Sequence, residues 1–185
     1  MSRTFTVTAR LNDRCQPEFR GALYEDPLHE TLQARGVGSV EGGGTLQSST
    51  GEISWCDVEI RLMSLDQELI DLVVAKLTSS GAPKGSKLIM PEGSDIAFGE
   101  TEGFALYLNG TDLAPEVYAQ SDVNVVIEEL LKIFGEDSKL HGYFEGPRET
   151  ALYFYGPSFG AMKDRSAQFL SSYPLCEKSR VEKIA

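Results

Sequence analysis

The chain has 185 residues, of which 41% are hydrophobic and 24% are charged, and its formal net charge is −11. These proportions are typical of a globular protein and exclude a disordered or fibrous chain. Nucleic acids and anionic membranes attract basic surfaces, so the acidic balance argues against both as partners. A basic protein would be attracted, although acidity also serves solubility alone.

The first half of the chain alternates between strand and helix patterns. Apolar and polar residues alternate at 5–11, as in a half-buried strand, and a short helix is predicted to begin at Asp26-Pro27 and end at Gly36. A turn at 48–51 joins two strands into a hairpin, and Ser64 is the expected N-cap of the strongest helix. The expected elements are a strand, a helix, two strands, a helix and a strand, at residues 5–11, 25–35, 39–47, 51–62, 64–81 and 87–90.

The second half repeats this order. Its first strand-like segment is predicted to bend into a hairpin at 101–103. The segments are residues 95–110, 121–135, 140–146, 150–156, 158–173 and 179–185. The sequence therefore predicts an α+β protein with two tandem ferredoxin-like (β-α-β-β-α-β) units, residues 1–90 and 95–185, packed into one compact molecule. Residues 90–94 are the expected connector.

Three consecutive glycines, Gly42, Gly43 and Gly44, lie inside a predicted strand. A phosphate-binding loop needs a strand before it and a helix after it, and here that order is reversed. Glycine weakens a strand, so we considered a β-bulge, the close approach of another protein group, and the close approach of a ligand. In the ligand interpretation, Gly42, Gly43 and Gly44 form the site with Trp55 on the opposing strand.

The candidate catalytic residues are His141, Tyr143 and Glu145, which fall on one face of a regular strand. Such a row suits proton transfer, and it equally suits a solvated strand face. Histidine and cysteine never cluster at the spacing of metal ligands, so neither a metal nor a cofactor is predicted.

Candidate protein-binding residues come from two strands. Asp57 and Glu59 alternate with apolar residues and are expected to face outward, and Tyr153 and Tyr155 are expected to form an outward tyrosine face. Tyrosine is enriched at interface hot spots. The alternative is a core strand with one aromatic face turned inward and a tyrosine face turned outward.

Three cysteines, Cys15, Cys56 and Cys176, are widely spaced and form no C-x-x-C motif. This pattern favours free thiols in a reducing compartment over a disulfide framework. The N-terminus lacks the apolar run of a signal peptide, and no run of about 18 apolar residues occurs. We therefore expect a cytoplasmic protein.

The repeated element order resembles that of regulatory modules that pair ferredoxin-like units around a small ligand. The acidic profile without a catalytic constellation is similar to that of bacterial immunity proteins, which neutralise a basic toxin domain. Three hypotheses follow. The first is a non-enzymatic acidic protein that binds another protein, such as an immunity-type inhibitor of a basic toxin or enzyme. The alternatives are a small-molecule sensor with its ligand between the units, and an enzyme that uses His141.

Overall fold

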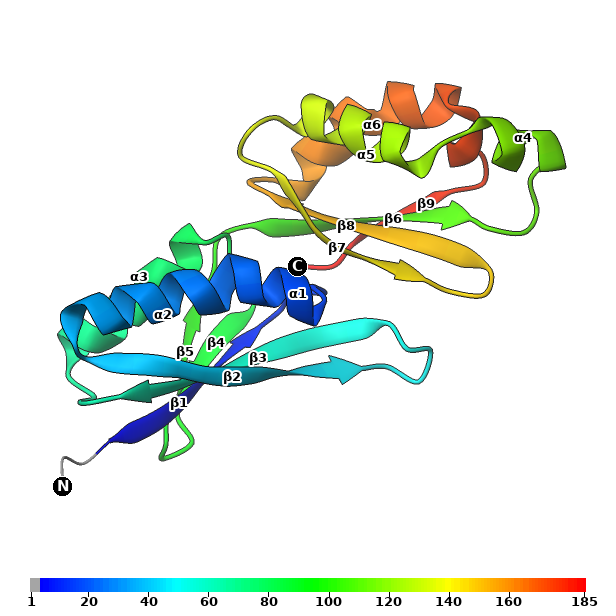
Figure 1. Ribbon diagram of the computed structural model, residues 1–185. Helices are drawn as coiled ribbons and strands as arrows, with labels where there is room; N and C mark the ends of the chain where they lie inside the picture. The colour runs from blue at the N-terminus through cyan, green and yellow to red at the C-terminus, as the bar shows by residue number, and fades with distance from the viewer. Residues whose placement is uncertain (1–3) are drawn as a thin grey trace.

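The structure, a computed structural model, describes residues 4–185 and contains two antiparallel β-sheets with helices packed on them (Figure 1). The first sheet has five strands in the order β2-β3-β1-β4-β5, and the second has four in the order β7-β8-β6-β9. The chain is therefore an α+β protein, as its sequence predicts. None of the helices in the described residues is long and apolar enough to cross a membrane.

The first sheet is covered by helices on one face. Its strands are β1 (Phe5–Leu11), β2 (Gly38–Gln47), β3 (Ile53–Leu62), β4 (Ser86–Ile89) and β5 (Asp95–Phe98). Its helical segments are α1 (Pro17–Arg20), the π-helical turn η1 (Gly21–Glu25), α2 (Asp26–Arg35) and α3 (Gln67–Ser79). The alternation in β1 and β3 turns Val7, Val58 and Ile60 toward the buried leucines of α2 and α3. Burial of this apolar face is what stabilises the layer.

The second sheet repeats the arrangement. Its strands are β6 (Glu102–Asn109), β7 (Lys139–Glu145), β8 (Glu149–Gly156) and β9 (Arg180–Lys183). Its helices are α4 (Pro115–Gln120), α5 (Val123–Phe134), α6 (Phe159–Ser172) and the 3-10 turn η2 (Pro174–Cys176). Phe104, Phe134 and Phe154 pack edge to face in the core between this sheet and its helices.

Two expected helix starts need correction. The helix before β2 begins at Pro17 rather than near residue 25, because α1, η1 and α2 follow one another without a break. The N-cap of α3 is Asp66, whose side chain accepts a hydrogen bond from the amide of Leu69, whereas Ser64 lies outside the helix. Both differences concern where an element begins, which local sequence specifies weakly.

The expected connector at residues 90–94 is a turn inside the first sheet. It closes a hairpin in which β5 pairs antiparallel with β4, with the amide of Met90 bonded to the carbonyl of Ser94. The chain passes to the second sheet only between Phe98 and Glu102. The hairpin expected at 101–103 is therefore absent, since its two arms belong to different sheets.

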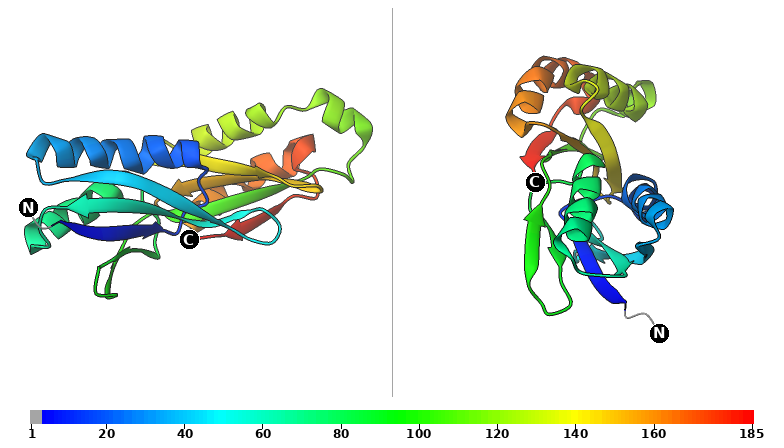
Figure 2. Two further views of the ribbon diagram at one scale, coloured as in Figure 1. Left: turned by 60° about the horizontal axis from the view of Figure 1, so that its bottom comes forward. Right: turned by 90° about the vertical axis from the view of Figure 1, so that its left-hand side faces the viewer.

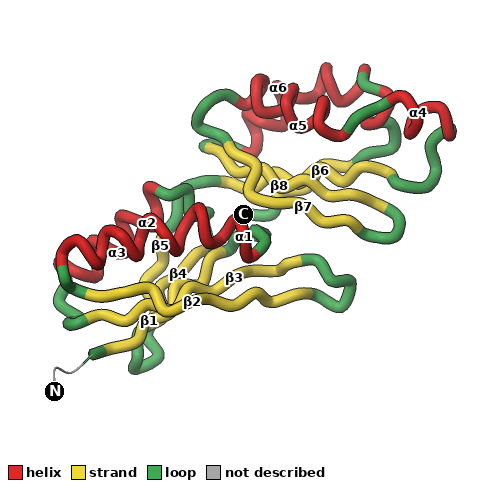
Figure 3. The backbone as a smooth tube through the Cα atoms, viewed as in Figure 1, coloured by secondary structure: helices red, strands yellow, loops and turns green. Residues whose placement is uncertain are grey.

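The helix-free face of the second sheet packs against the first half of the chain. Figures 1 and 3 show α5 and α6 on one face of this sheet, with α1 and the β2–β3 hairpin next to the other, and Figure 2 shows the same layers from two more directions. The packed face consists of Ala105, Tyr107, Ala151, Tyr153 and Tyr155. Because both faces of the sheet are covered, β6 and β8 are buried almost continuously.

Candidate ligand site between the two sheets

A buried aspartate and a buried histidine meet where the two halves join. Nδ1 of His141, on β7, lies 2.7 Å from Oδ2 of Asp13, in the loop that follows β1. The hydroxyl of Tyr24 donates to the same oxygen at 2.6 Å. Asp13 and His141 are 0% and 1% exposed. A carboxylate in such surroundings needs these partners, because burial of an unpaired charge is costly.

This contact occupies Nδ1 of the histidine ring and leaves Nε2 for another partner. An ionised carboxylate can only accept, so Nδ1 of His141 carries the proton that bonds to Asp13. In the neutral imidazole, Nε2 is then an acceptor. Among residues 4–185, no protein group forms a hydrogen bond with Nε2. The ring edge that carries Nε2 lies beside Gly81, where an added Cβ would be 3.7 Å from this nitrogen.

A β-bulge turns His141 toward Asp13. The pairing of β7 with β8 shifts register between Leu140 and Gly142, so His141 is the extra residue. Gly142 stands opposite Tyr153, on the face that meets the first half, whereas Tyr143 stands opposite Leu152, on the helix-covered face.

The expected row of His141, Tyr143 and Glu145 is therefore not formed. Tyr143 is 41% exposed, and Glu145 is exposed near the end of the strand. Regular alternation of side chains along the strand would have placed these three residues on one face. The bulge at His141 interrupts the alternation, so His141 is separated from Tyr143 and Glu145.

Beside His141 lies a cavity of about 270 Å³ that both halves of the chain line. Its walls come from the end of α3, the link between the sheets, the α5–β7 loop, and β7 with β8. The lining residues are Thr78, Ser79, Ser80, Gly81, Thr101, Glu136, Asp137, Lys139, His141 and Tyr155. The lining carries the carboxylates of Glu136 and Asp137 and the single ammonium of Lys139. This net negative charge favours a neutral or cationic ligand over an anionic one.

Tyr155 forms the aromatic wall next to this histidine. Its ring stacks on the ring of His141 with centroids 4.6 Å apart, and its hydroxyl accepts a hydrogen bond from the amide of Arg14 at 3.0 Å. Burial raises the pKa of Tyr155 well above its ordinary value, so the phenol stays neutral. The histidine is thereby held on its face by Tyr155 and on its edge by Asp13.

A second polar cluster joins the halves next to this site. Oε1 of Glu52, at the β2–β3 turn, accepts hydrogen bonds from the hydroxyls of Tyr107 and Tyr153, both at 2.7 Å, and pairs with Arg14. Burial alone would raise the pKa of Glu52, but the bonds from the two tyrosines and Arg14 bring it below its ordinary value. This cluster fixes the hairpin against the second sheet.

The expected tyrosine face is not on the surface. Tyr153 and Tyr155 are 0% and 1% exposed, because the first half of the chain covers them. Asp57 and Glu59 do face away from the core, as expected. Asp57 forms two hydrogen bonds of 2.9 Å with the guanidinium of Arg10, whereas Glu59 is exposed.

The glycines of β2 make room for the protein itself. Gly42 lies at a bulge and has φ of 140°, and a Cβ on Gly43 would lie 2.8 Å from Nε of Arg20. Arg20 is 8% exposed and donates to the carbonyl of Gly44 at 3.0 Å. Two of the three interpretations of the glycines are therefore correct: the strand has a β-bulge, and another protein group approaches it closely. That group is Arg20, which occupies the space over Gly43.

Trp55 does not cover the glycines. It stands opposite Leu46, and the guanidinium of Arg10 lies 5.0 Å from the centre of its ring. The candidate ligand site of Gly42, Gly43, Gly44 and Trp55 is therefore not assembled, since the tryptophan and the glycines occupy different parts of the hairpin.

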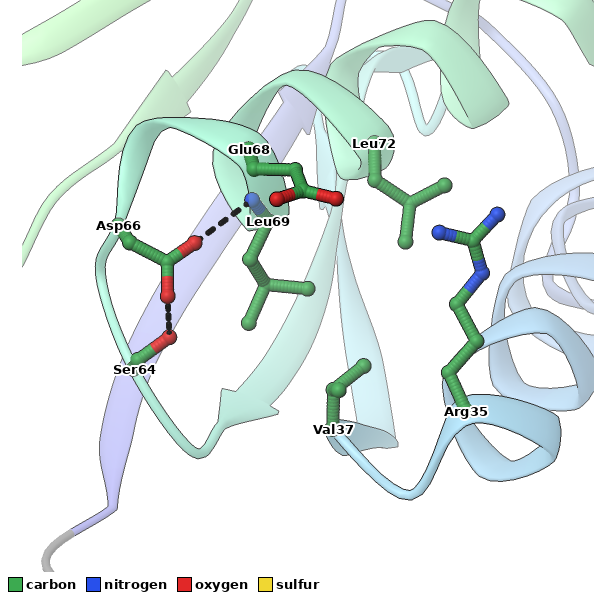
Figure 4. Close-up of a pocket in the computed structure, with 7 residues that line it drawn as sticks. All are labelled: Arg35, Val37, Ser64, Asp66, Glu68, Leu69 and Leu72. Atoms are coloured by element: carbon green, nitrogen blue, oxygen red, sulfur yellow. Dashed lines mark hydrogen bonds between the residues drawn. The ribbon is translucent and has the colours of Figure 1, made fainter.

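A smaller cavity of about 190 Å³ lies between the end of α2 and the start of α3 (Figure 4). It is lined by Arg35, Val37, Ser64, Asp66, Glu68, Leu69 and Leu72. The carboxylate of Asp66 is already bonded to the amide of Leu69 and the hydroxyl of Ser64. Asp66 and Ser64 therefore serve to cap α3. Because Nε2 of His141 has no such protein partner within residues 4–185, the cavity beside His141 is the stronger candidate ligand site.

Sequence reasoning missed most of the residues that surround His141. Asp13, Arg14, Tyr24 and Glu52 come from a loop, a π-helical turn and a hairpin turn, where no periodic pattern marks a side chain as buried. Within the part of the chain that the structure describes, no group of three or more His, Cys, Asp or Glu side chains is placed to hold a metal ion.

No protein-family model matches the chain, and no curated protein matches its sequence. Among solved structures, one described as a monooxygenase from Lactobacillus acidophilus NCFM is 10% identical, with a TM-score of 0.31, and the match covers 97% of this chain and 92% of the other. The first two RRM domains of a yeast poly(U)-binding protein are 8% identical, with a TM-score of 0.27 and coverage of 97% and 99%. An anthrone oxidase-like protein is 12% identical, with a TM-score of 0.29 and coverage of 97% and 90%. Similarities this weak establish no function.

Proposed function

We propose that this chain is a small-molecule-sensing protein whose ligand binds between two ferredoxin-like units, in the cavity beside His141. The observation that carries the proposal is the buried histidine itself. Asp13 holds its Nδ1, and its Nε2 has no protein partner within residues 4–185 and lies at a cavity with walls from both halves. Ligand pockets combine such a concave site with a few oriented polar groups.

The strand orders support the description as two units. Residues 4–98 form β2-β3-β1-β4 with β5 added at the edge, and residues 102–185 form β7-β8-β6-β9. In each, the first strand is central between the third and the fourth, which is the order of a split β-α-β unit. The link between the units, including Thr101, forms part of the cavity wall, so a ligand there contacts both units.

The cavity also indicates the chemistry of the ligand. Its volume of about 270 Å³ suits a small metabolite rather than a nucleotide. The ligand would donate a hydrogen bond to Nε2 of His141 and present a neutral or positive group to Glu136 and Asp137. We therefore expect a small amine or alcohol to bind better than an anionic compound.

The test is a thermal-shift screen of the full chain with small amines, alcohols and carboxylic acids. A binder at about 100 times its Kd is expected to raise Tm by about 5–10 °C. Asp137→Lys, a change on the exposed rim, should weaken binding of an amine. Glu68→Gln, which removes an acidic charge at the cavity of Figure 4, is a control that should leave binding unchanged. If no compound shifts Tm, or if Asp137→Lys and Glu68→Gln behave alike, the sensor proposal is wrong.

A second candidate, an acidic immunity-type inhibitor of a basic protein, is favoured by the net charge of −11. The burial of Tyr153 and Tyr155 removes two of its expected contacts, and Glu59 remains as an exposed acidic one. This hypothesis predicts that a basic partner elutes from the immobilised protein in a salt gradient, because exposed charges are screened by salt. Binding that does not respond to salt would contradict it.

A further inference from the structure

Two buried cysteine side chains touch in the first half of the chain. The sulfur atoms of Cys15 and Cys56 are 3.4 Å apart, and both residues are 0% exposed. Cys56 lies in β3, and Cys15 lies in the loop between β1 and α1, two residues after Asp13. The two positions are separated by 41 residues of sequence, so tertiary structure alone brings them together.

A disulfide needs only a small movement from this arrangement. An S–S bond is about 2.05 Å long, so the two sulfur atoms must approach by about 1.4 Å. Cys56 is held in the sheet between its partners Leu11 and Thr45, whereas Cys15 belongs to a segment without regular structure. Adjustment of that loop can bring the sulfur atoms together without disturbing the strand.

We infer that Cys15 and Cys56 are a disulfide-forming pair, a modification site that responds to oxidising disulfides of low molecular mass such as oxidised glutathione. The thiolate of one cysteine attacks the glutathione disulfide, forms a mixed disulfide and releases one glutathione thiolate. The second cysteine, as its thiolate, attacks the protein sulfur of the mixed disulfide and releases the other glutathione. Two protein thiols are thus oxidised, and one glutathione disulfide is reduced to two thiols.

Burial of the two cysteines makes disulfide formation slow while the loop that carries Cys15 is in place. The contact with Cys56, burial and the nearby charge of Asp13 all raise the pKa of Cys15, so little thiolate is present. The segment that carries Cys15 is also held by the contact of Asp13 with His141. The pair is therefore protected until this loop opens, and equilibration over hours is required.

The third cysteine is an internal control. Cys176 lies in the core of the second half, away from the core that contains Cys15 and Cys56. Burial raises its pKa to about 11, and no sulfur contact is found for it in the described part of the chain. An oxidant that acts without regard to structure would modify Cys176 as well, whereas the proposal assigns oxidation to the pair.

The experiment is mass-spectrometric mapping of the full wild-type chain. The protein is equilibrated overnight in mixtures of reduced and oxidised glutathione, denatured in iodoacetamide and digested without reduction. We expect a peptide that links Cys15 to Cys56, a mass lower by about 2 Da for the two hydrogen atoms lost, and an alkylated Cys176. Cys176→Ser should retain the link, whereas Cys15→Ser and Cys56→Ser should each abolish it.

Stability provides a second readout that needs no variant. A bond between positions 15 and 56 closes a long loop, so Tm measured without reductant should exceed Tm with reductant by about 5 °C or more. If Cys15 and Cys56 are recovered fully alkylated from the oxidising mixtures, or if Cys176 forms the link, the inference is wrong. If the Cys15–Cys56 bond forms but lowers the Tm of the protein, the bond strains the native fold, and the inference is also wrong.

Discussion

Nδ1 of His141 lies 2.7 Å from Oδ2 of Asp13, although 128 positions separate them in the sequence. The contact joins the loop after β1 to the bulge of β7, and therefore joins the two halves of the chain. It also leaves Nε2 of His141 beside a cavity. The architecture and the candidate site thus depend on the same pair of residues.

The first prediction concerns this pair. Within residues 4–185, His141→Ala leaves the buried carboxylate of Asp13 with Tyr24 as its remaining side-chain partner, and it opens a cavity at the stacked Tyr155. We expect a loss of about 3 kcal/mol in the free energy of unfolding, measured by urea denaturation. The matched control is Tyr143→Ala on the same strand, with an expected effect of about 0.5 kcal/mol because this side chain is largely exposed. Equal effects would show that the pair has no structural role.

The second prediction is a dependence on acidic pH. The pKa of Glu52 in the folded protein is below its ordinary value, so its ionised form stabilises the fold above about pH 4.5, and this contribution is lost as the pH falls. Glu52→Gln should cost about 2 kcal/mol at pH 7, and the difference from wild type should shrink toward pH 3. Urea denaturation at several pH values measures both. The control is Glu18→Gln on the exposed surface of α1, which should change the free energy of unfolding at pH 7 by less than about 0.5 kcal/mol.

The third prediction is a dependence on alkaline pH. Burial first, and then the hydrogen bond to Glu52, raises the pKa of Tyr107 to about 12. Because the folded state favours the protonated phenol, the hydrogen-bonded Tyr107 stabilises the fold fully below about pH 10, the ordinary pKa of tyrosine. This stabilisation is lost as the pH rises from about 10 to about 12. Tyr107→Phe should therefore be less stable than wild type at pH 8, by about 1 kcal/mol, and lose less stability than wild type at pH 11. Parallel losses in the two proteins would refute this role.

The fourth prediction uses neighbouring glycines of β2. A Cβ on Gly43 would overlap the carbonyl oxygen of Asp57 and crowd Arg20, whereas a Cβ on Gly44 would meet nothing within 4 Å. Gly43→Ala should lower the free energy of unfolding by about 2–3 kcal/mol. Gly44→Ala should leave it unchanged or raise it by about 0.5 kcal/mol, since alanine suits a strand better than glycine does. Comparable losses at both positions would mean that Arg20 does not require the glycine.

Much of the local structure follows from local chemistry. Alternation gives the strand at 5–11, the turn at 48–51 closes the predicted hairpin, and the apolar stripe at 121–135 becomes α5. These features could be predicted because each depends on residues a few positions apart. The start of a helix was less predictable, as the shift from Ser64 to Asp66 shows, because several nearby polar residues can cap.

The candidate site could not be predicted in the same way. A β-bulge at His141 breaks the alternation that would have aligned it with Tyr143. Gly142, the next residue, is the one local sign, because glycine inside a strand often marks a bulge, but it does not show where His141 then points. Asp13 follows a buried strand, but nothing local indicates that its partner lies on β7. Tyr153 and Tyr155 were expected outside because tyrosine suits a polar surface as well as a buried, hydrogen-bonded one.

By itself, the sequence determined the α+β class, the repeated order of strands and helices, and the acidic charge. Periodicity and capping are encoded over a few residues, and charge is a sum over the chain, so neither needs a tertiary partner to be seen. Only the tertiary structure decided that β5 joins the first sheet, that a tyrosine face is buried between the halves, and that Asp13 meets His141. A period of two shows that a strand face is suited to burial, but the surface that covers it is chosen by packing between distant segments.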